Sequence, residues 1–159
     1  MRESARIEIP AFRTLYIEHI VCDYNGTIAF DGRVSEGTRK MLQELAERFS
    51  LHVVTADTFG SASRELEGLD LRLHILESSD HTHEKGALVD RLGADRCVAI
   101  GNGRNDRLML HKAVLGIAVM AEEGCAASTL AGAEILCRSG EEALGLLLHP
   151  KRLVATLRQ

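Results

Sequence analysis

The chain has no tryptophan and few other aromatic residues, with two tyrosines and four phenylalanines among 159 residues. Aliphatic side chains must therefore form most of its core, which a chain of this length is large enough to bury. Proline occurs only at positions 10 and 150, near the two ends. We see no repeat, low-complexity tract or linker between them, so we expect a single domain over residues 1–159.

Other absences exclude whole classes of protein. The formal net charge is −4, so there is no excess of positive charge to favour nucleic acid or an anionic membrane. No apolar run is long enough to span a membrane, and residues 1–10 lack the apolar segment of a signal peptide. The four cysteines form no CxxC pair, which favours buried thiols over zinc ligands or disulfides. We therefore expect a cytoplasmic protein that binds neither nucleic acid nor a membrane.

Short apolar segments alternate with segments of helical periodicity along most of the chain. Strands are expected at 19–23, 51–55, 71–76, 97–100, 115–120 and 134–137, and helices at 35–50, 58–67, 84–92, 105–113, 124–131 and 139–148. A hairpin of strands 6–9 and 13–17, a flap or loop at 27–34, a polar loop at 78–83 and a short helical tail at 151–158 complete the pattern. This alternation predicts an α/β fold, in which a parallel sheet carries helices on both faces. Right-handed crossovers then bring the carboxyl ends of all strands to one edge.

The segment Val21–Thr27 contains the most informative of these strand ends. An apolar run ends on Asp23, and a tight Asn25–Gly26 turn follows. Asn-Gly is a strong hairpin signal, so one interpretation is a simple turn between antiparallel strands. The other is a carboxylate at the end of a central parallel strand, where open α/β sheets place their chemistry. This segment alone favours neither interpretation.

Other polar residues are expected at the same edge of the sheet. Thr55 and Asn102 end or follow predicted strands, while Lys85 and Asp106 lie where helices begin. Two carboxylates, a hydroxyl group and a lysine suit a divalent cation together with a phosphoryl group. An aspartate beside a neutralised phosphate can act as a nucleophile and form an aspartyl-phosphate. Phosphoryl chemistry therefore explains these residues better than a hairpin does.

Four segments in this order resemble the haloacid dehalogenase (HAD) superfamily. They are Asp-Tyr-Asn-Gly-Thr at 23–27, Val-Val-Thr-Ala-Asp at 53–57, Lys85, and Gly-Asn-Gly-Arg-Asn-Asp-Arg-Leu-Met-Leu at 101–110. The last is most similar to a motif of P-type ATPases and of their soluble, membrane-free relatives. The resemblance covers about residues 19–148. It implies a Rossmann-like three-layer sandwich with a mainly parallel central sheet, and magnesium-dependent phosphoryl transfer through an aspartyl-phosphate.

The resemblance also implies roles for individual residues. Asp23 would be the nucleophile and a metal ligand, and Asn25 would bind the metal through its backbone carbonyl. The implied catalytic residues are Asp23, Asn25, Thr55 and Lys85; the phosphate-binding residues are Gly26, Thr55, Ala56 and Lys85; the magnesium ligands are Asp23, Asn25, Asn102 and Asp106. The expected function is that of a magnesium-dependent phosphohydrolase, with a phosphorylated partner, small or macromolecular, as substrate.

Two positions depart from the HAD pattern. Asn25 stands where HAD phosphatases usually carry a second aspartate that acts as general acid and base. An amide cannot transfer a proton, and loss of such a group typically lowers the rate about 10²–10⁴-fold. Asn102 replaces the principal acidic metal ligand, so we expect weaker metal binding. The alternative function is therefore a catalytically weakened HAD domain that binds a metal, a phospho-ligand or a partner protein as a regulatory module. Dehalogenation of a small haloacid is less favoured, because Lys85 and a magnesium-type site suit phosphate better.

The spacing of the motifs leaves no room for a cap domain. Only 31 residues separate Asp23 from Thr55, and 29 separate Thr55 from Lys85. The site should therefore be open, and capless relatives either act on large substrates or use a neighbouring subunit as a lid, which leaves a homo-oligomer open. His81 and His83 could be a solvated loop, a transition-metal pair or a source of a substitute proton donor. Asp57 could cap the following helix or lie near the phosphate.

Overall fold

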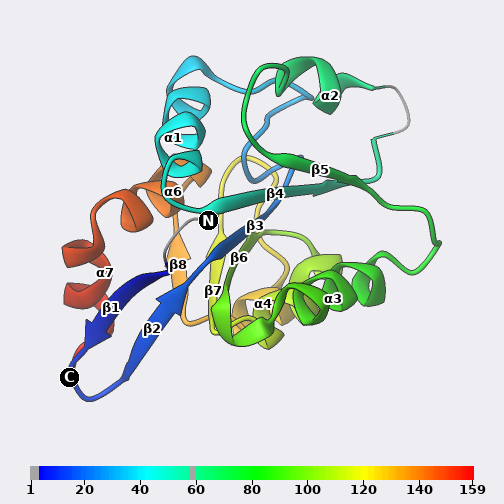
Figure 1. Cartoon of the computed structure of the whole chain (residues 1–159). Helices are drawn as coiled ribbons and strands as arrows, with labels where there is room; N and C mark the ends of the chain where they lie inside the picture. Colours follow the sequence, from blue (N-terminus) through cyan, green and yellow to red (C-terminus); the bar gives the residue numbers. More distant parts are fainter. Residues whose placement is uncertain (1–3, 58–59) are drawn as a thin grey trace.

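The central element of the structure is a parallel sheet. The computed structural model describes residues 4–57 and 60–159, and within them six strands form this sheet in the order β5-β4-β3-β6-β7-β8 (Figure 1). The strands are β3 (His19–Asp23), β4 (Ser50–Thr55), β5 (Arg72–Ile75), β6 (Cys97–Gly101), β7 (Leu115–Val119) and β8 (Ile135–Cys137). Every pairing between them is parallel, as the sequence predicts.

The strand order changes direction between β3 and β6. The chain runs outward from β3 through β4 to β5, then returns to the other side of β3 and continues outward from β6 to β8. Loops that leave the carboxyl ends of β3 and β6 therefore diverge, which opens a crevice at this topological switch point. Asp23 ends β3, and Asn102 directly follows β6.

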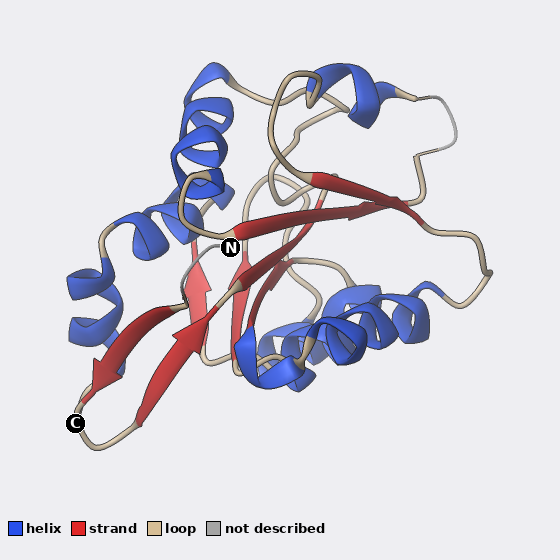
Figure 2. Cartoon of the chain, viewed as in Figure 1, coloured by secondary structure: helices blue, strands red, loops and turns tan. Residues whose placement is uncertain are grey.

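Helices cover both faces of the sheet (Figure 2). The elements outside the strands are α1 (Glu36–Ala46), α2 (Ser61–Glu65), α3 (His81–Leu92), η1 (Ala94–Arg96), η2 (Arg104–Asp106), α4 (Arg107–Lys112), α5 (Ala127–Ala131), α6 (Gly140–Leu148) and α7 (Pro150–Leu157). Leu45 of α1 and Leu144 of α6 join one buried cluster with Ile20 of β3. Leu88 of α3 packs in a second cluster with Val21, the neighbouring residue on β3. The predicted three-layer α/β sandwich is confirmed.

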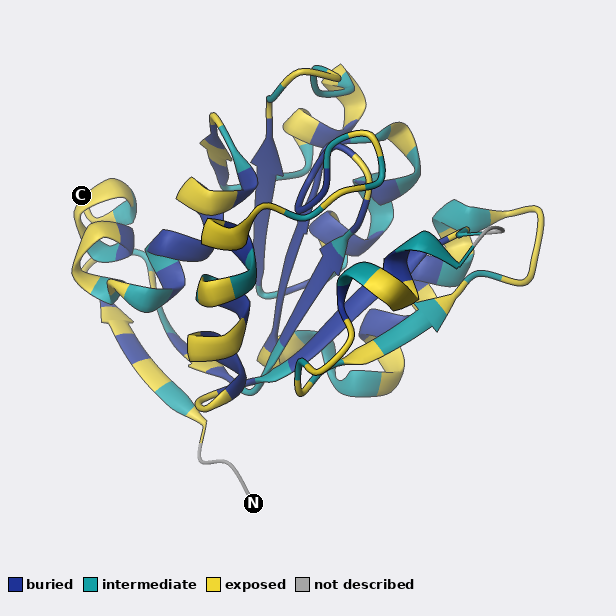
Figure 3. Cartoon of the chain, turned by 90° about the horizontal axis from the view of Figure 1, so that it is seen from above, coloured by how far each residue is buried: buried dark blue, intermediate teal, exposed yellow. Residues whose placement is uncertain are grey.

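The strands lie between these helix layers and are deeply buried (Figure 3). All residues of β6 and β7 are buried, which matches their continuous apolar sequences. Strands covered on both faces have such sequences, whereas strands with a solvent-exposed face alternate between apolar and polar residues. Within the described residues, no helix has both the length and the apolar character needed to cross a membrane.

Serine residues cap α1 and α6, the two helices that pack together against one face of the sheet. Ser35 accepts a hydrogen bond from the Thr38 N–H at 3.0 Å and so caps α1. Ser139 likewise accepts from the Glu142 N–H at 3.1 Å at the start of α6. In a capping box Glu142 would accept from the Ser139 N–H, but its carboxylate instead accepts from the N–H of Arg138 at 3.0 Å.

The amino-terminal hairpin and the carboxyl-terminal helix are both present. Strands β1 (Ala5–Ile9) and β2 (Arg13–Ile17) form an antiparallel two-stranded sheet of their own, as predicted. Helix α7 begins at Pro150, a favourable first position because proline lacks an N–H group. It buries Leu153 in the main core and contacts β1.

Several predicted helix limits were wrong. Helix α3 begins at His81 rather than at residue 84, because Asp80 caps it by accepting the His83 N–H at 3.1 Å. Helix α1 ends at Ala46, and the chain turns so that Ser50 can pair with His19 in the sheet. Helix α4 is preceded by the 3₁₀ turn η2, which starts at Arg104. Helix α2 is shorter than predicted, and residues 58 and 59 of the predicted helix lie outside the described residues.

Candidate active site

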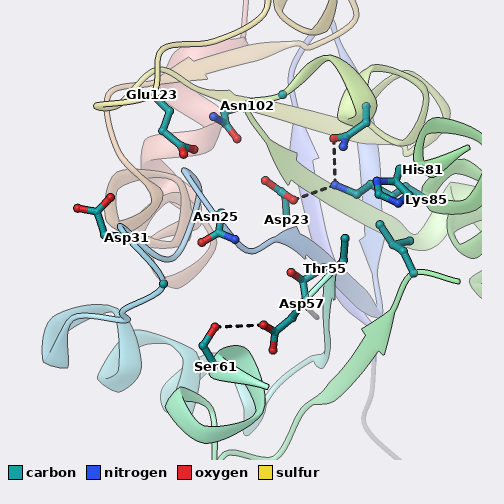
Figure 4. A pocket seen from close by; sticks show the side chains of 15 residues that line it. Asp23, Asn25, Asp31, Thr55, Asp57, Ser61, His81, Lys85, Asn102 and Glu123 are labelled. Atoms are coloured by element: carbon teal, nitrogen blue, oxygen red, sulfur yellow. Dashed lines mark hydrogen bonds and ion pairs between the residues drawn. The ribbon is translucent and has the colours of Figure 1, made fainter. Parts of the chain in front are cut away.

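A pocket of about 620 Å³ lies at the carboxyl ends of β3, β4 and β6 (Figure 4). Six of the eight residues predicted for the site line it, namely Asp23, Asn25, Thr55, Ala56, Lys85 and Asn102. Further lining residues come from the flap, from α2 and α3 and from the loops that follow β6 and β7. The sheet edge therefore brings together the segments that the sequence analysis singled out.

A tight turn follows Asp23 and redirects the chain away from the sheet. The Tyr24 carbonyl accepts hydrogen bonds from the backbone N–H groups of residues 27–29 at 3.0–3.3 Å. Gly26 has a φ of +79°, a conformation that glycine adopts without strain, and its N–H donates to the Ala29 carbonyl at 2.8 Å. Since β3 pairs in parallel with both neighbours, the turn does not form a hairpin, and that interpretation was wrong.

Lys85 joins the two carboxylates of the site. Its Nζ donates to Asp23 Oδ1 at 2.8 Å and to Asp106 Oδ1 at 2.7 Å. It also donates to Asn105 Oδ1 at 3.1 Å. The other oxygen of Asp106 accepts from the backbone N–H groups of Asn102 and Gly103 at 3.1 and 2.9 Å. Asp106 is fully buried and Lys85 is 2% exposed, so these contacts fix both side chains within the protein.

Burial and mutual charge shift the pKa values in this cluster. Burial raises the pKa of Asp23 above its ordinary value, and the Asp106 carboxylate raises it further, while Lys85 opposes both effects. Burial alone would lower the pKa of Lys85, but the two carboxylates outweigh it and the pKa is raised. Lys85 therefore stays protonated, and with both aspartates ionised the cluster carries one more negative than positive charge.

The Thr27 hydroxyl lies between Asp23 and Asn102, and no role was predicted for it. Its Oγ1 lies 3.3 Å from Asp23 Oδ2 and 3.3 Å from Asn102 Oδ1. A hydroxyl has one proton, so it can donate to only one of these oxygens at a time. Converging oxygens with excess negative charge are the donors that magnesium prefers. The residues present therefore fit a divalent cation.

The flap between β3 and α1 forms part of the pocket wall. Phe30 and Arg33 exchange two backbone hydrogen bonds of 2.9 Å, and Asp31 and Gly32 between them both have positive φ. The Tyr24 hydroxyl donates to the Gly32 carbonyl at 2.8 Å and holds the tip against the core. The predicted flap is confirmed, and the Asp31–Gly32 pair at its tip is a dipeptide that favours such a turn.

Comparison with known proteins places this geometry in context. No protein-family model matches the chain. A 63-residue segment, 40% of the chain, is 44% identical to the uncharacterised protein MJ0073 of Methanocaldococcus jannaschii and covers 68% of it. A 39-residue segment, 24% of the chain, is 46% identical to the uncharacterised protein MJ0072 of the same organism and covers 89% of it. The chain belongs to the same family as these archaeal proteins.

Solved structures identify the fold. The 3-deoxy-D-manno-octulosonate 8-phosphate phosphatase of Moraxella catarrhalis matches with a TM-score of 0.70 and 19% identity, over 89% of this chain and 94% of that one. The deoxy-D-mannose-octulosonate 8-phosphate phosphatase of Haemophilus influenzae matches with a TM-score of 0.68 and 12% identity, over 90% and 94%. A protein of Legionella pneumophila described as a HAD-superfamily hydrolase matches with a TM-score of 0.69 and 16% identity, over 88% and 86%. The chain has the HAD fold.

Within this HAD fold, the remaining predicted residues lie at different depths. Asp106 is beneath the pocket, and Gly26 uses its N–H within the turn, so neither lines the wall. No group of three or more His, Cys, Asp or Glu side chains in the described part of the chain is arranged to hold a metal ion. A HAD-type metal site would therefore depend on amide and backbone oxygens as well. The individual roles of the site residues stay predictions.

The structure separates the positions of His81, His83 and Asp57. His81 lines the pocket, whereas the His83 ring is exposed and pairs with Asp80 at 2.6 Å. Asp57 also lines the pocket, and at the same time it accepts from Ser61 Oγ at 3.1 Å and from the Ala62 N–H at 2.9 Å at the start of α2. Asp57 therefore stabilises the start of α2 as predicted, while its place near a bound phosphate stays a prediction, and His81 is the one of the two histidines that lines the pocket.

Proposed function

We propose that the chain is a magnesium-dependent phosphohydrolase that forms an aspartyl-phosphate on Asp23 from a phosphate monoester. One observation carries this proposal. Asp23 ends a central strand at the topological switch point, lines the pocket, and is held 2.8 Å from a buried lysine that a second carboxylate orients. The HAD fold adds support, because similar structures include phosphatases solved with magnesium and phosphate or with cobalt.

The proposed reaction has two steps. An Asp23 carboxylate oxygen attacks phosphorus, which forms an acyl phosphate and breaks the bond to the ester oxygen. The departing alkoxide takes a proton and leaves as the alcohol. Water then attacks the phosphorus of the acyl phosphate, which releases inorganic phosphate and restores the Asp23 carboxylate. Lys85 and Thr55 stabilise the phosphoryl charge, because both line the pocket beside Asp23.

Magnesium would be held by Asp23, Asn102 and the Asn25 carbonyl, where it would neutralise the phosphoryl oxygens. Asn25 lines the pocket but cannot transfer a proton. His81 is the pocket residue that we propose as the source of the proton for the leaving group. The cytoplasmic location and a homo-oligomer stay predictions.

Phosphate release from an aryl phosphate tests the proposal. The wild type with magnesium should release phosphate, and Asp23→Asn should reduce release to the uncatalysed background, because the amide cannot form the acyl phosphate. Asp95→Asn is the matched control, since Asp95 is exposed in η1 at the opposite edge of the sheet. Equal rates for the wild type and Asp23→Asn would rule out Asp23 as the nucleophile.

The second candidate is a catalytically weakened module that binds a metal or phospho-ligand. The two asparagines favour it, because neither Asn25 nor Asn102 supplies the carboxylate that HAD phosphatases use. The variant Asn25→Asp separates the two functions. A functioning phosphohydrolase limited by proton transfer should accelerate about 100-fold or more. A binding module should stay at background in the same assay.

A further inference from the structure

Asn102 uses its amide group in a way that an aspartate could not. Its Nδ2 donates to the Gly124 carbonyl at 3.3 Å, and its backbone carbonyl accepts from the Ala126 N–H at 2.9 Å. An ionised carboxylate only accepts hydrogen bonds, so it would repel the Gly124 carbonyl. Asn102 therefore anchors the loop that follows β7, at the cost of one negative charge in the pocket.

That loop carries Glu123 into the same pocket. Glu123 lines the pocket wall and lies beside Asn102 in Figure 4. A Cβ atom on Gly26 would lie 1.8 Å from Glu123 Oε2 and 2.6 Å from Asn102 Nδ2. The carboxylate and the amide thus occupy the space that the absent side chain of Gly26 leaves open. This position is next to Asn25, whose carbonyl is a predicted magnesium ligand.

Two acids of the pocket, Asp31 and Glu123, make no hydrogen bond or ion pair within the described residues, and Glu123 is the one that lies beside Asn102. Asp23 is bound to Lys85, and Asp57 accepts hydrogen bonds at the start of α2. No hydrogen bond or ion pair involves the Glu123 carboxylate within residues 4–57 and 60–159. Its exposed side chain can rotate, so it can turn an oxygen toward a cation bound beside Asn102.

We propose that Glu123 supplies the second anionic ligand of the magnesium site, and that Asn102 and Glu123 together replace one aspartate of the HAD pattern. Asn102 positions the loop and offers Oδ1, while Glu123 provides the charge. This inference rests on the proposed function, since it needs a divalent cation beside Asp23.

Binding of Mn²⁺, followed by electron paramagnetic resonance without any substrate, tests the inference separately from turnover. Glu123→Gln should weaken Mn²⁺ binding about tenfold or more, because it removes the charge but keeps the shape. Glu122→Gln is the matched control: Glu122 is the exposed neighbour, does not line the pocket, and should bind Mn²⁺ like the wild type. Equal binding by the Glu122 and Glu123 variants would overturn the inference.

A charge exchange gives a second, independent readout. Asn102→Asp alone loses the hydrogen bond to Gly124 and places a carboxylate beside Glu123. In the Glu123→Gln background, the same change returns one negative charge to the site and should restore most of the Mn²⁺ affinity. A double variant that binds no better than Glu123→Gln would contradict the inference.

The two failures can be told apart. If the wild type does not bind Mn²⁺, or if Asp23→Asn does not weaken that binding, the metal-dependent function and the role of Glu123 both fail. If Asp23→Asn weakens Mn²⁺ binding but Glu123→Gln leaves the affinity unchanged, only the role of Glu123 fails. Thermal unfolding of each variant confirms that the comparison is made on folded protein.

Discussion

Two groups of polar side chains lie on the face of the central sheet that α3 covers, and they differ in charge. The charged cluster consists of Asp23, Lys85 and Asp106 at the carboxyl edge. The histidine row crosses three strands, with His52 2.9 Å from His74 and 3.1 Å from His19 through ring nitrogens. A layer of valines, which packs on α3, separates the two groups.

His52, at the centre of the histidine row, is buried, and His19 and His74 on either side of it are half-buried. Burial lowers the pKa of His52 to about 4, so the ring is neutral near pH 7. A neutral imidazole can donate from one nitrogen and accept at the other, which satisfies the row without an ion. The sheet can therefore bury polar groups in neutral form. The excess negative charge at the carboxyl edge is not needed for packing, and it is the feature that suits a cation.

The largest expected loss of stability comes from a substitution that removes the lysine of the charged cluster. Lys85→Met should lower the free energy of unfolding by about 3–5 kcal/mol, because it leaves two carboxylates without their buried counter-ion. Urea denaturation near pH 7 measures this loss. Lys112→Met is the matched control, because Lys112 pairs with Asp90 at the partly exposed surface. Such pairs contribute about 0–1 kcal/mol, so equal losses for the two variants would contradict the assigned difference in burial.

The next effect belongs to the histidine row and depends on pH. In the unfolded chain His52 binds a proton below its ordinary pKa of about 6.5, whereas in the fold it does so only near pH 4. The unfolded state therefore binds more protons between these values, and stability falls as the pH falls through this window. His52 should account for up to roughly 3 kcal/mol of that loss.

Two variants isolate this contribution in urea denaturation repeated from neutral to acidic pH. His52→Gln should flatten the pH profile, because the titrating group is gone. His111→Gln replaces an exposed histidine on α4 and should keep the wild-type slope. A profile for His52→Gln that runs parallel to the wild type would show that the row does not set the acid sensitivity.

The charged cluster could be predicted from the sequence more fully than the histidine row. Asp23 ends an apolar strand, and Lys85 and Asp106 lie where helices begin after later strands, so parallel topology brings all three to one edge. The histidine row depends on which strands are neighbours and in what register, for example His52 opposite Val21 and His74 opposite Val54. Periodicity within one segment contains neither of these facts.

The residues missed in the pocket have a similar explanation. Glu123 lies in a loop without periodicity, and it reaches the pocket because Asn102 binds the Gly124 carbonyl. Thr27 was part of a recognised motif, but its contact with Asp23 depends on the tight turn between them. Outside the pocket, the polar segment 78–83 predicts a loop, but Asp80 caps α3 and the helix begins at His81.

The smallest of the three effects tests how rigidly the charged cluster is held. A Cβ on Gly101 would lie 2.5 Å from Asp106 Cγ, and that carboxylate cannot move aside without losing Lys85 and two backbone N–H groups. Gly101→Ala should therefore cost about 1–3 kcal/mol of stability in urea denaturation. Gly103→Ala, two residues further along the chain, meets its nearest atom at 3.3 Å with an ordinary φ of −89° and should change stability by less than about 0.5 kcal/mol. Similar small losses for both variants would mean that Asp106 shifts freely, and the charged cluster would then be no more constrained than the neutral row.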